Sequence, residues 1–60
     1  MNYLGDTNRR EVHDLSNQKD NCKIDEIKMV HKRHFIPDTA LQANSEGYSS
    51  CMWCIENYQN

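Results

Sequence analysis

The sequence predicts a small α+β domain with an N-terminal β-hairpin, two short helices and a C-terminal knuckle formed by two cysteines. Three observations lead to this prediction. Apolar and polar residues alternate near the N-terminus, which is typical of strands. Further along, apolar residues recur at steps of three and four, which is typical of helices. The chain has 60 residues, 37% of them hydrophobic, so we expect residues 1–60 to form a single domain with a thin core.

The hairpin is expected first along the chain. Residues 3–5 are followed by the turn-forming residues 6–8, and residues 9–13 then place Val12 on one face and His13 on the other. Residues 16–21 contain no apolar side chain, so we expect a loop there that ends at the start of a helix.

The first helix is predicted over residues 22–32, because Ile24, Ile27 and Val30 recur at helical spacing. Residues 34–36 are short and apolar and come just before a proline, which favours a brief strand.

The second helix is predicted to begin after Asp38 or Thr39, either of which can cap it, and to stop at Gly47. Residues 55–58 are expected to add one closing helical turn.

Cysteine and histidine are the residues that could compensate for the thin core. Cys51 and Cys54 are separated by two residues, and a tight turn at this spacing directs two sulfur atoms at one tetrahedral ion. Cys22 and His13 flank the polar loop and would complete four ligands from two separate regions. We therefore predict a Zn²⁺ site formed by His13, Cys22, Cys51 and Cys54, which would connect most of the chain to one ion.

Spacing leaves alternatives open at this site. His31 or His34 could replace His13 as the fourth ligand. The pair Cys51 and Cys54 could also be a redox dithiol, although nothing in the chain indicates the alternation of strands and helices that usually carries such motifs, or the cysteines could be structural and bind no metal.

The order of these features resembles the zinc-binding domain of Ada-type DNA-repair proteins, and more closely the small His-Cys-Cys-Cys version of that domain appended to some nucleases. The likeness spans about residues 3–55 and is most specific where Ala43, Gly47, Tyr48 and the two last cysteines follow the family's order. In the repair protein the first ligand is a cysteine that accepts a methyl group. The matching position here is His13, so the resemblance does not imply that reaction.

The amount and distribution of charge indicate which partners the chain could bind. The net charge of −2 argues against a chain wrapped in nucleic acid, yet all seven basic residues lie in residues 1–34. A patch within residues 9–10 and 23–33 could contact nucleic acid through Arg9, Arg10, Lys28, Lys32 and Arg33.

The favoured function is a structural zinc mini-domain that acts as a protein-interaction module. Its candidate partner contacts are Met52, Trp53 and Tyr58, which could alternatively belong to the core. A zinc-stabilised nucleic-acid-binding module is the alternative. We do not expect an enzyme or a small-molecule substrate, because three cysteines and one histidine suit a closed site better than one that activates water. Catalysis would need a reactive thiol or an open zinc site, with His31 or His34 as base.

The sequence also gives an expectation about location. No apolar run is long enough to cross a membrane, and no segment has the pattern of a secretion signal, so we expect a cytoplasmic protein.

Overall fold

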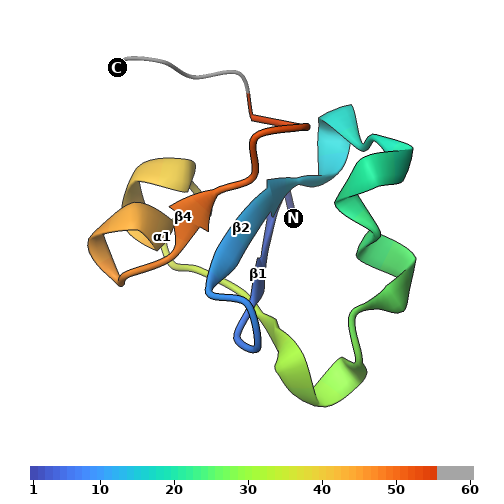
Figure 1. Cartoon of the computed structure of the whole chain (residues 1–60). Coiled ribbons are helices and arrows are strands. Elements are labelled where there is room, and N and C mark those ends of the chain that lie inside the picture. Colours follow the sequence, from blue (N-terminus) through green and yellow to red (C-terminus); the bar gives the residue numbers. More distant parts are fainter. Residues whose placement is uncertain (56–60) are drawn as a thin grey trace.

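The computed structural model describes residues 1–55 and confirms the α+β class (Figure 1). These residues form a four-stranded sheet, one α-helix and four short 3-10 helices. In chain order the elements are β1 (Tyr3–Asp6), β2 (Glu11–Asp14), η1 (Leu15–Asn17), η2 (Asp20–Cys22), η3 (Ile24–Glu26), η4 (Met29–His31), β3 (Lys32–Arg33), α1 (Ala40–Ser45) and β4 (Ser49–Ser50).

The sheet has the strand order β3-β1-β2-β4. β1 and β2 form the predicted antiparallel hairpin, with Leu4 opposite His13. β3 pairs antiparallel with β1, whereas β4 pairs parallel with β2 and sets Val12 opposite Ser50. This pairing places the residues that follow β4 next to the end of β2, where His13 lies.

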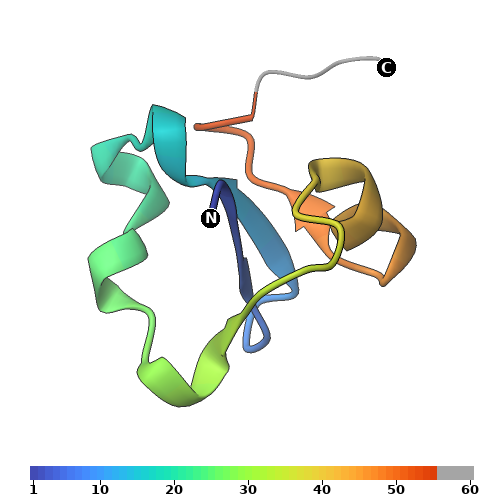
Figure 2. The same cartoon turned by 180° about the vertical axis from the view of Figure 1, so that it is seen from behind.

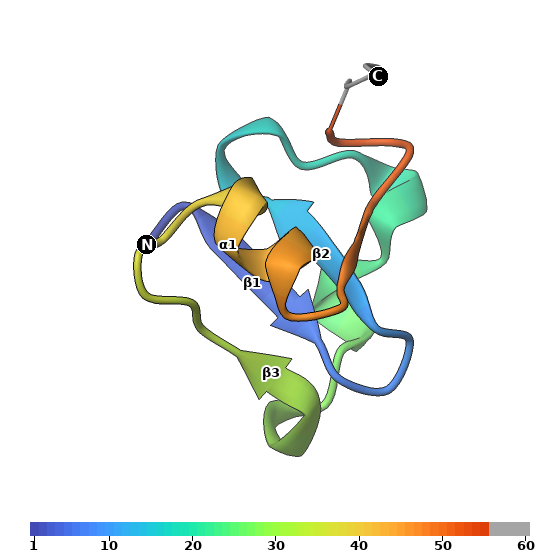
Figure 3. The same ribbon diagram turned by 90° about the vertical axis from the view of Figure 1, so that its left-hand side faces the viewer.

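A small apolar core lies between the sheet and α1, which packs over β2 and β4 (Figure 3). Val12, Phe35, Ala43 and Tyr48 form its buried cluster, and the rings of Phe35 and Tyr48 meet edge to face with their centroids 5.1 Å apart. Gly5 is required beneath this cluster, because a Cβ atom at that position would lie 2.6 Å from Cζ of Phe35. The sheet therefore touches its aromatic core through a glycine backbone.

The second predicted helix is confirmed as α1. Thr39 is its N-cap, because its side chain accepts a hydrogen bond from the backbone N–H of Gln42 at 3.0 Å. Gly47 follows the helix with φ of 94°, a backbone conformation that favours glycine.

The first predicted helix, over residues 22–32, is wrong. The structure has separate 3-10 helices there, because Lys23 adopts a left-handed conformation and Ile27 and Lys28 are extended. The apolar positions that suggested a helix do not form a buried stripe, since Val30 is 80% exposed and Ile24 and Ile27 are partly buried. A helix of this length needs a packed apolar face to be stable, and residues 22–32 present no such face to the rest of the described chain.

The predicted brief strand is displaced in the structure, and most of the predicted closing turn is not described. The brief strand lies at β3, two residues before the predicted residues 34–36, and Phe35 instead fills the core. The closing turn predicted at residues 55–58 falls, apart from Ile55, outside the described residues.

We call residues 15–31 the 3-10 arm. Figures 1 and 2 show this arm on one side of the β1–β2 hairpin and α1 on the opposite side. No helix among residues 1–55 has the length and apolar character required to span a membrane.

Candidate metal centre

Four potential ligands converge at one point between the sheet and the 3-10 arm. His13 lies on β2, Cys22 ends η2, and Cys51 and Cys54 follow β4. One ligand atom from each of these residues lies within 4.8 Å of every other. All four side chains are buried, with exposed fractions between 1% and 3%. The structure thus brings together the four residues that the sequence singled out.

The distances within this cluster fit a tetrahedral ion. The Sγ atoms of Cys22 and Cys51 are 3.5 Å apart, and Sγ of Cys54 is 3.7 Å from Nδ1 of His13. Zinc bound tetrahedrally at about 2.3 Å from sulfur and about 2.0–2.1 Å from nitrogen separates its ligand atoms by about 3.6–3.8 Å. The donor set and these two distances therefore fit a tetrahedrally bound metal ion.

Backbone pairing fixes the position of the two C-terminal cysteines. The N–H of Cys51 donates to the carbonyl of Val12 at 3.0 Å, which extends the parallel pairing of β4 with β2. Sγ of Cys54 accepts a hydrogen bond from the backbone N–H of Asp14 at 3.2 Å. The amide of Asn17 donates to the carbonyl of Cys54 at 2.8 Å. The turn that carries both cysteines is thus attached to β2 and to η1.

His13 has a polar neighbour near each ring nitrogen. Nδ1 faces the cysteines, whereas Nε2 lies 3.6 Å from Oε1 of Glu11. A carboxylate on the second nitrogen of a metal-binding histidine fixes the ring orientation and the tautomer. Sequence reasoning missed this role of Glu11, although strand alternation already placed Glu11 and His13 on one face of β2.

The surroundings favour the uncharged forms of His13 and Cys54 when no metal is bound. Burial lowers the pKa of His13, although the nearby carboxylates of Glu11 and Asp6 partly oppose this shift. Burial also raises the pKa of Cys54 to about 12. A metal ion would have to displace the thiol proton, so binding at this site would release protons.

The alternative ligands lie elsewhere. His31 is partly exposed in η4, where it lines a cavity that Cys22 also borders, and His34 is exposed. Neither belongs to the four-residue cluster. All three cysteines are free thiols. Their burial argues against a redox dithiol, since such a pair must be reached by the thiol of another molecule.

The basic residues proposed for nucleic acid fall into two groups. Arg10 donates to the carbonyl of Glu46 at 3.1 Å and lies over the ring of Tyr48, and Arg33 pairs with the Glu46 carboxylate at 2.6 Å. These two guanidinium groups thus hold α1 against the sheet. The other three, Arg9, Lys28 and Lys32, are exposed.

The candidate partner contacts Met52 and Trp53 lie in the turn between the two last cysteines, where they are 76% and 47% exposed. Tyr58 lies outside the described residues.

Comparisons with protein-family models, with curated proteins and with solved structures found no match to this chain.

Proposed function

We propose that this chain is a zinc-binding mini-domain of the Ada-like metal-binding kind, in which one structural Zn²⁺ holds the fold and exposed residues contact a protein partner. The observation that carries this proposal is the cluster of His13, Cys22, Cys51 and Cys54, four buried ligands within 4.8 Å of one another. Three thiolates and one imidazole form a donor set typical of structural zinc sites.

A structural role fits this site better than catalysis. Four protein ligands fill a tetrahedral coordination shell, so no position is left for water or substrate. The four ligand side chains are also buried, with exposed fractions of 3% or less, whereas a catalytic zinc must be reached by its substrate. We therefore propose that the chain is not an enzyme.

The small size of the apolar core supports the proposal that a metal ion contributes to folding. The apolar cluster contains four buried residues, and the three cysteines form the second buried cluster. A domain of this size rarely obtains sufficient stability from its core alone. In small metal domains the free energy of zinc binding is also the free energy of folding.

The proposed partner surface is the turn between Cys51 and Cys54. Met52 and Trp53 are exposed there, on a backbone whose two ends would both be fixed by the metal. Large apolar side chains presented on a rigid turn lose little conformational freedom on binding, which suits them as anchors of an interface.

Metal titration of the reduced apoprotein tests the zinc site. We expect one Zn²⁺ per chain, chain folding on zinc addition in circular dichroism and amide spectra, and a Co²⁺ form with the visible absorption of a tetrahedral thiolate site. His13→Ala should reduce zinc affinity strongly, while His31→Ala and His34→Ala serve as matched controls and should leave it unchanged. A chain that keeps sharp amide spectra after metal removal would overturn the proposal.

The partner surface needs a separate test. The double variant Met52→Ser, Trp53→Ser should keep its zinc stoichiometry and lose binding to proteins that crosslink to the original chain. The double variant Met29→Ser, Val30→Ser removes two exposed apolar side chains from the 3-10 arm and is the matched control. Equal effects of the two double variants would count against a surface at the turn.

A further inference from the structure

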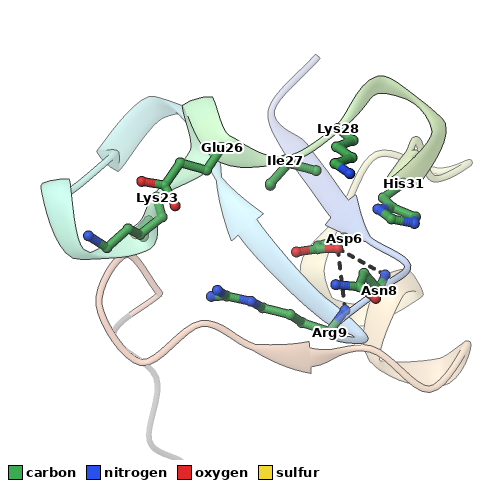
Figure 4. Close-up of a pocket in the computed structure, with 9 residues that line it drawn as sticks. Asp6, Asn8, Arg9, Lys23, Glu26, Ile27, Lys28 and His31 are labelled. Carbon is green, nitrogen blue, oxygen red and sulfur yellow. Dashed lines mark hydrogen bonds between the residues drawn. The ribbon is translucent and has the colours of Figure 1, made fainter.

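A cavity lies between the turn of the hairpin and the 3-10 arm (Figure 4). Its volume is about 360 Å³, at the lower end of the range for small-molecule sites. The hairpin side contributes Asp6 and Arg9, and the arm contributes Lys23, Ile27 and Lys28 together with Cys22, so the cavity adjoins the metal centre. This cavity and the apolar turn at Met52 and Trp53 are formed by different residues.

Three cations at this cavity have no acidic partner. Arg9, Lys23 and Lys28 are exposed, and none of them forms an ion pair with any of residues 1–55. Arg33 differs, because Glu46 already neutralises it. Two carboxylates, Asp6 and Glu26, also line the cavity. Positive charge is therefore in slight excess, and it is available to an anionic group.

Asp6 favours a ligand that can donate a hydrogen bond. Its side chain is 5% exposed, and Oδ1 accepts hydrogen bonds from the backbone N–H groups of Asn8 at 2.9 Å and Arg9 at 3.3 Å. Oδ2 accepts no hydrogen bond from residues 1–55, and Figure 4 shows it facing the interior of the cavity. A buried acceptor left without a donor is costly, so a ligand that supplies an N–H group would gain a strong contact there.

The walls beside this oxygen suit a flat ring. In Figure 4 the side chains of Ile27 and Arg9 lie on opposite sides of the free oxygen of Asp6. Aliphatic side chains and guanidinium planes both pack against the faces of nucleobases. A ring placed between them would point its edge at Asp6 and leave attached groups on the side of the Arg9 guanidinium and Lys23.

We propose that this cavity binds a nucleotide, with its phosphate at Arg9 and Lys23 and the exocyclic amino group of its base donating to Asp6. Adenine, cytosine and guanine carry such an amino group. Uracil presents one N–H between two carbonyl oxygens, which the carboxylate repels. The same chemistry is found in a free mononucleotide and in one nucleotide of a single strand. The site requires the folded chain but does not depend on a protein partner.

Binding is measured on the full-length, zinc-loaded chain by amide chemical shifts and by calorimetry at about 50 mM salt. The probes are AMP, CMP, GMP, UMP, inorganic phosphate and short single-stranded homopolymers. At least one amino-bearing mononucleotide should shift the amides that surround the cavity and bind about fivefold or more tightly than UMP. Tighter binding of the matching homopolymer would identify single-stranded nucleic acid as the source of the ligand, and binding of mononucleotides alone would identify free nucleotide.

Substitutions separate base recognition from general attraction by charge. Asp6→Asn keeps an oxygen for the two backbone N–H groups and presents an amide in place of the free oxygen, so the preference should reverse toward UMP. Lys23→Gln should weaken binding of all mononucleotides equally. Lys32→Gln removes the same charge from an exposed position outside the cavity and should have no effect. Zinc content and amide spectra confirm that each variant is folded.

Three results would overturn the proposal. The first is the absence of amide shifts near the cavity with any mononucleotide. The second is binding of inorganic phosphate as tightly as the nucleotides, which would show that no base is recognised. The third is an equal loss of affinity in Lys23→Gln and Lys32→Gln, which would indicate nonspecific attraction to a basic surface.

Discussion

The two sides of the hairpin are held in place by different interactions. On the side of α1, apolar side chains from β2, α1 and the segments beside them pack into one cluster, and aromatic rings meet at defined angles. On the other side, the 3-10 arm buries a single residue, Cys22. Its short helices make local hydrogen bonds and contribute no strand to the sheet. Burial stabilises one side, whereas the other depends on a potential metal ligand.

Backbone hydrogen bonds anchor the arm at its ends. Leu15 donates to the carbonyl of Asn2 at 2.7 Å where the arm begins, and the carbonyl of His31 accepts from Thr7 at 2.8 Å where it ends. Cys22 is the buried point between these two contacts. We therefore expect the arm to open locally before the sheet and α1 do.

Loss of the metal ligand in the arm should have the largest effect. Structural zinc sites contribute about 10–16 kcal/mol of binding free energy in small domains. Cys22→Ser should therefore reduce zinc affinity by orders of magnitude, and amide protection should vanish first in residues 15–31. Asn21→Ser, one residue earlier and exposed, is the control and should retain both zinc and protection. At a zinc concentration that still loads the Cys22→Ser variant, equal amide protection in residues 15–31 and in the sheet would contradict the division between the two sides.

Loss of core packing should affect the other side. Phe35 is 4% exposed and touches Tyr48 and the backbone of Gly5. Phe35→Ala should reduce the free energy of unfolding by about 3–5 kcal/mol. Thermal unfolding of the zinc-loaded protein measures this loss. Ile36→Ala removes a neighbouring apolar side chain that is 89% exposed, and a similar loss in this control would argue against a specific core.

The difference between the α1 side and the 3-10 arm also explains which features the sequence could predict. Cys51 and Cys54 have a local spacing with a direct chemical meaning, and Cys22 is the one other cysteine, whereas the spacing alone leaves the choice among His13, His31 and His34 open. The hairpin and α1 were predictable because alternation, a cap and a glycine stop all act within a few residues. The structure places these elements close to where the sequence indicated.

The arm could not be predicted in the same way. Ile24, Ile27 and Val30 satisfy a helical pattern, but a pattern stabilises a helix only when its apolar face is buried. Here the chain turns at Lys23 and Val30 faces solvent. β4 consists of two serines and gave no strand signal, because pairing with β2 depends on the tertiary fold. The cavity at Asp6 also has walls from distant segments, which no local spacing reveals.

Substitution of Glu11 tests whether a β2 side chain next to His13 affects the metal site, whose ligands come from both the sheet and the 3-10 arm. Glu11→Ala removes the carboxylate from Nε2 of His13 and should weaken zinc binding about 10–100-fold, as measured by competition with a chelator. Glu11→Gln retains an acceptor and should recover part of the affinity. Nitrogen chemical shifts of His13 report the tautomer and should change in the Ala variant. Asp25→Ala, which removes an equal charge from the arm, should leave these shifts unchanged.

Asp38 should give the smallest effect, confined to the side that contains α1. Its carboxylate accepts hydrogen bonds from the backbone N–H groups of Asn2 at 2.6 Å and Tyr3 at 3.0 Å, and chiefly the bond from Asn2 lowers its pKa below the usual 3.8. A pKa that is lower in the folded state stabilises the protein above pH 3.8, and this contribution is lost as the pH falls through the folded value. Asp38→Asn should therefore reduce amide protection in β1 at pH 6 while residues 15–31 keep theirs. A carboxyl titration of Asp38 by carbon NMR gives the sign directly, because a midpoint above 3.8 would contradict the two hydrogen bonds.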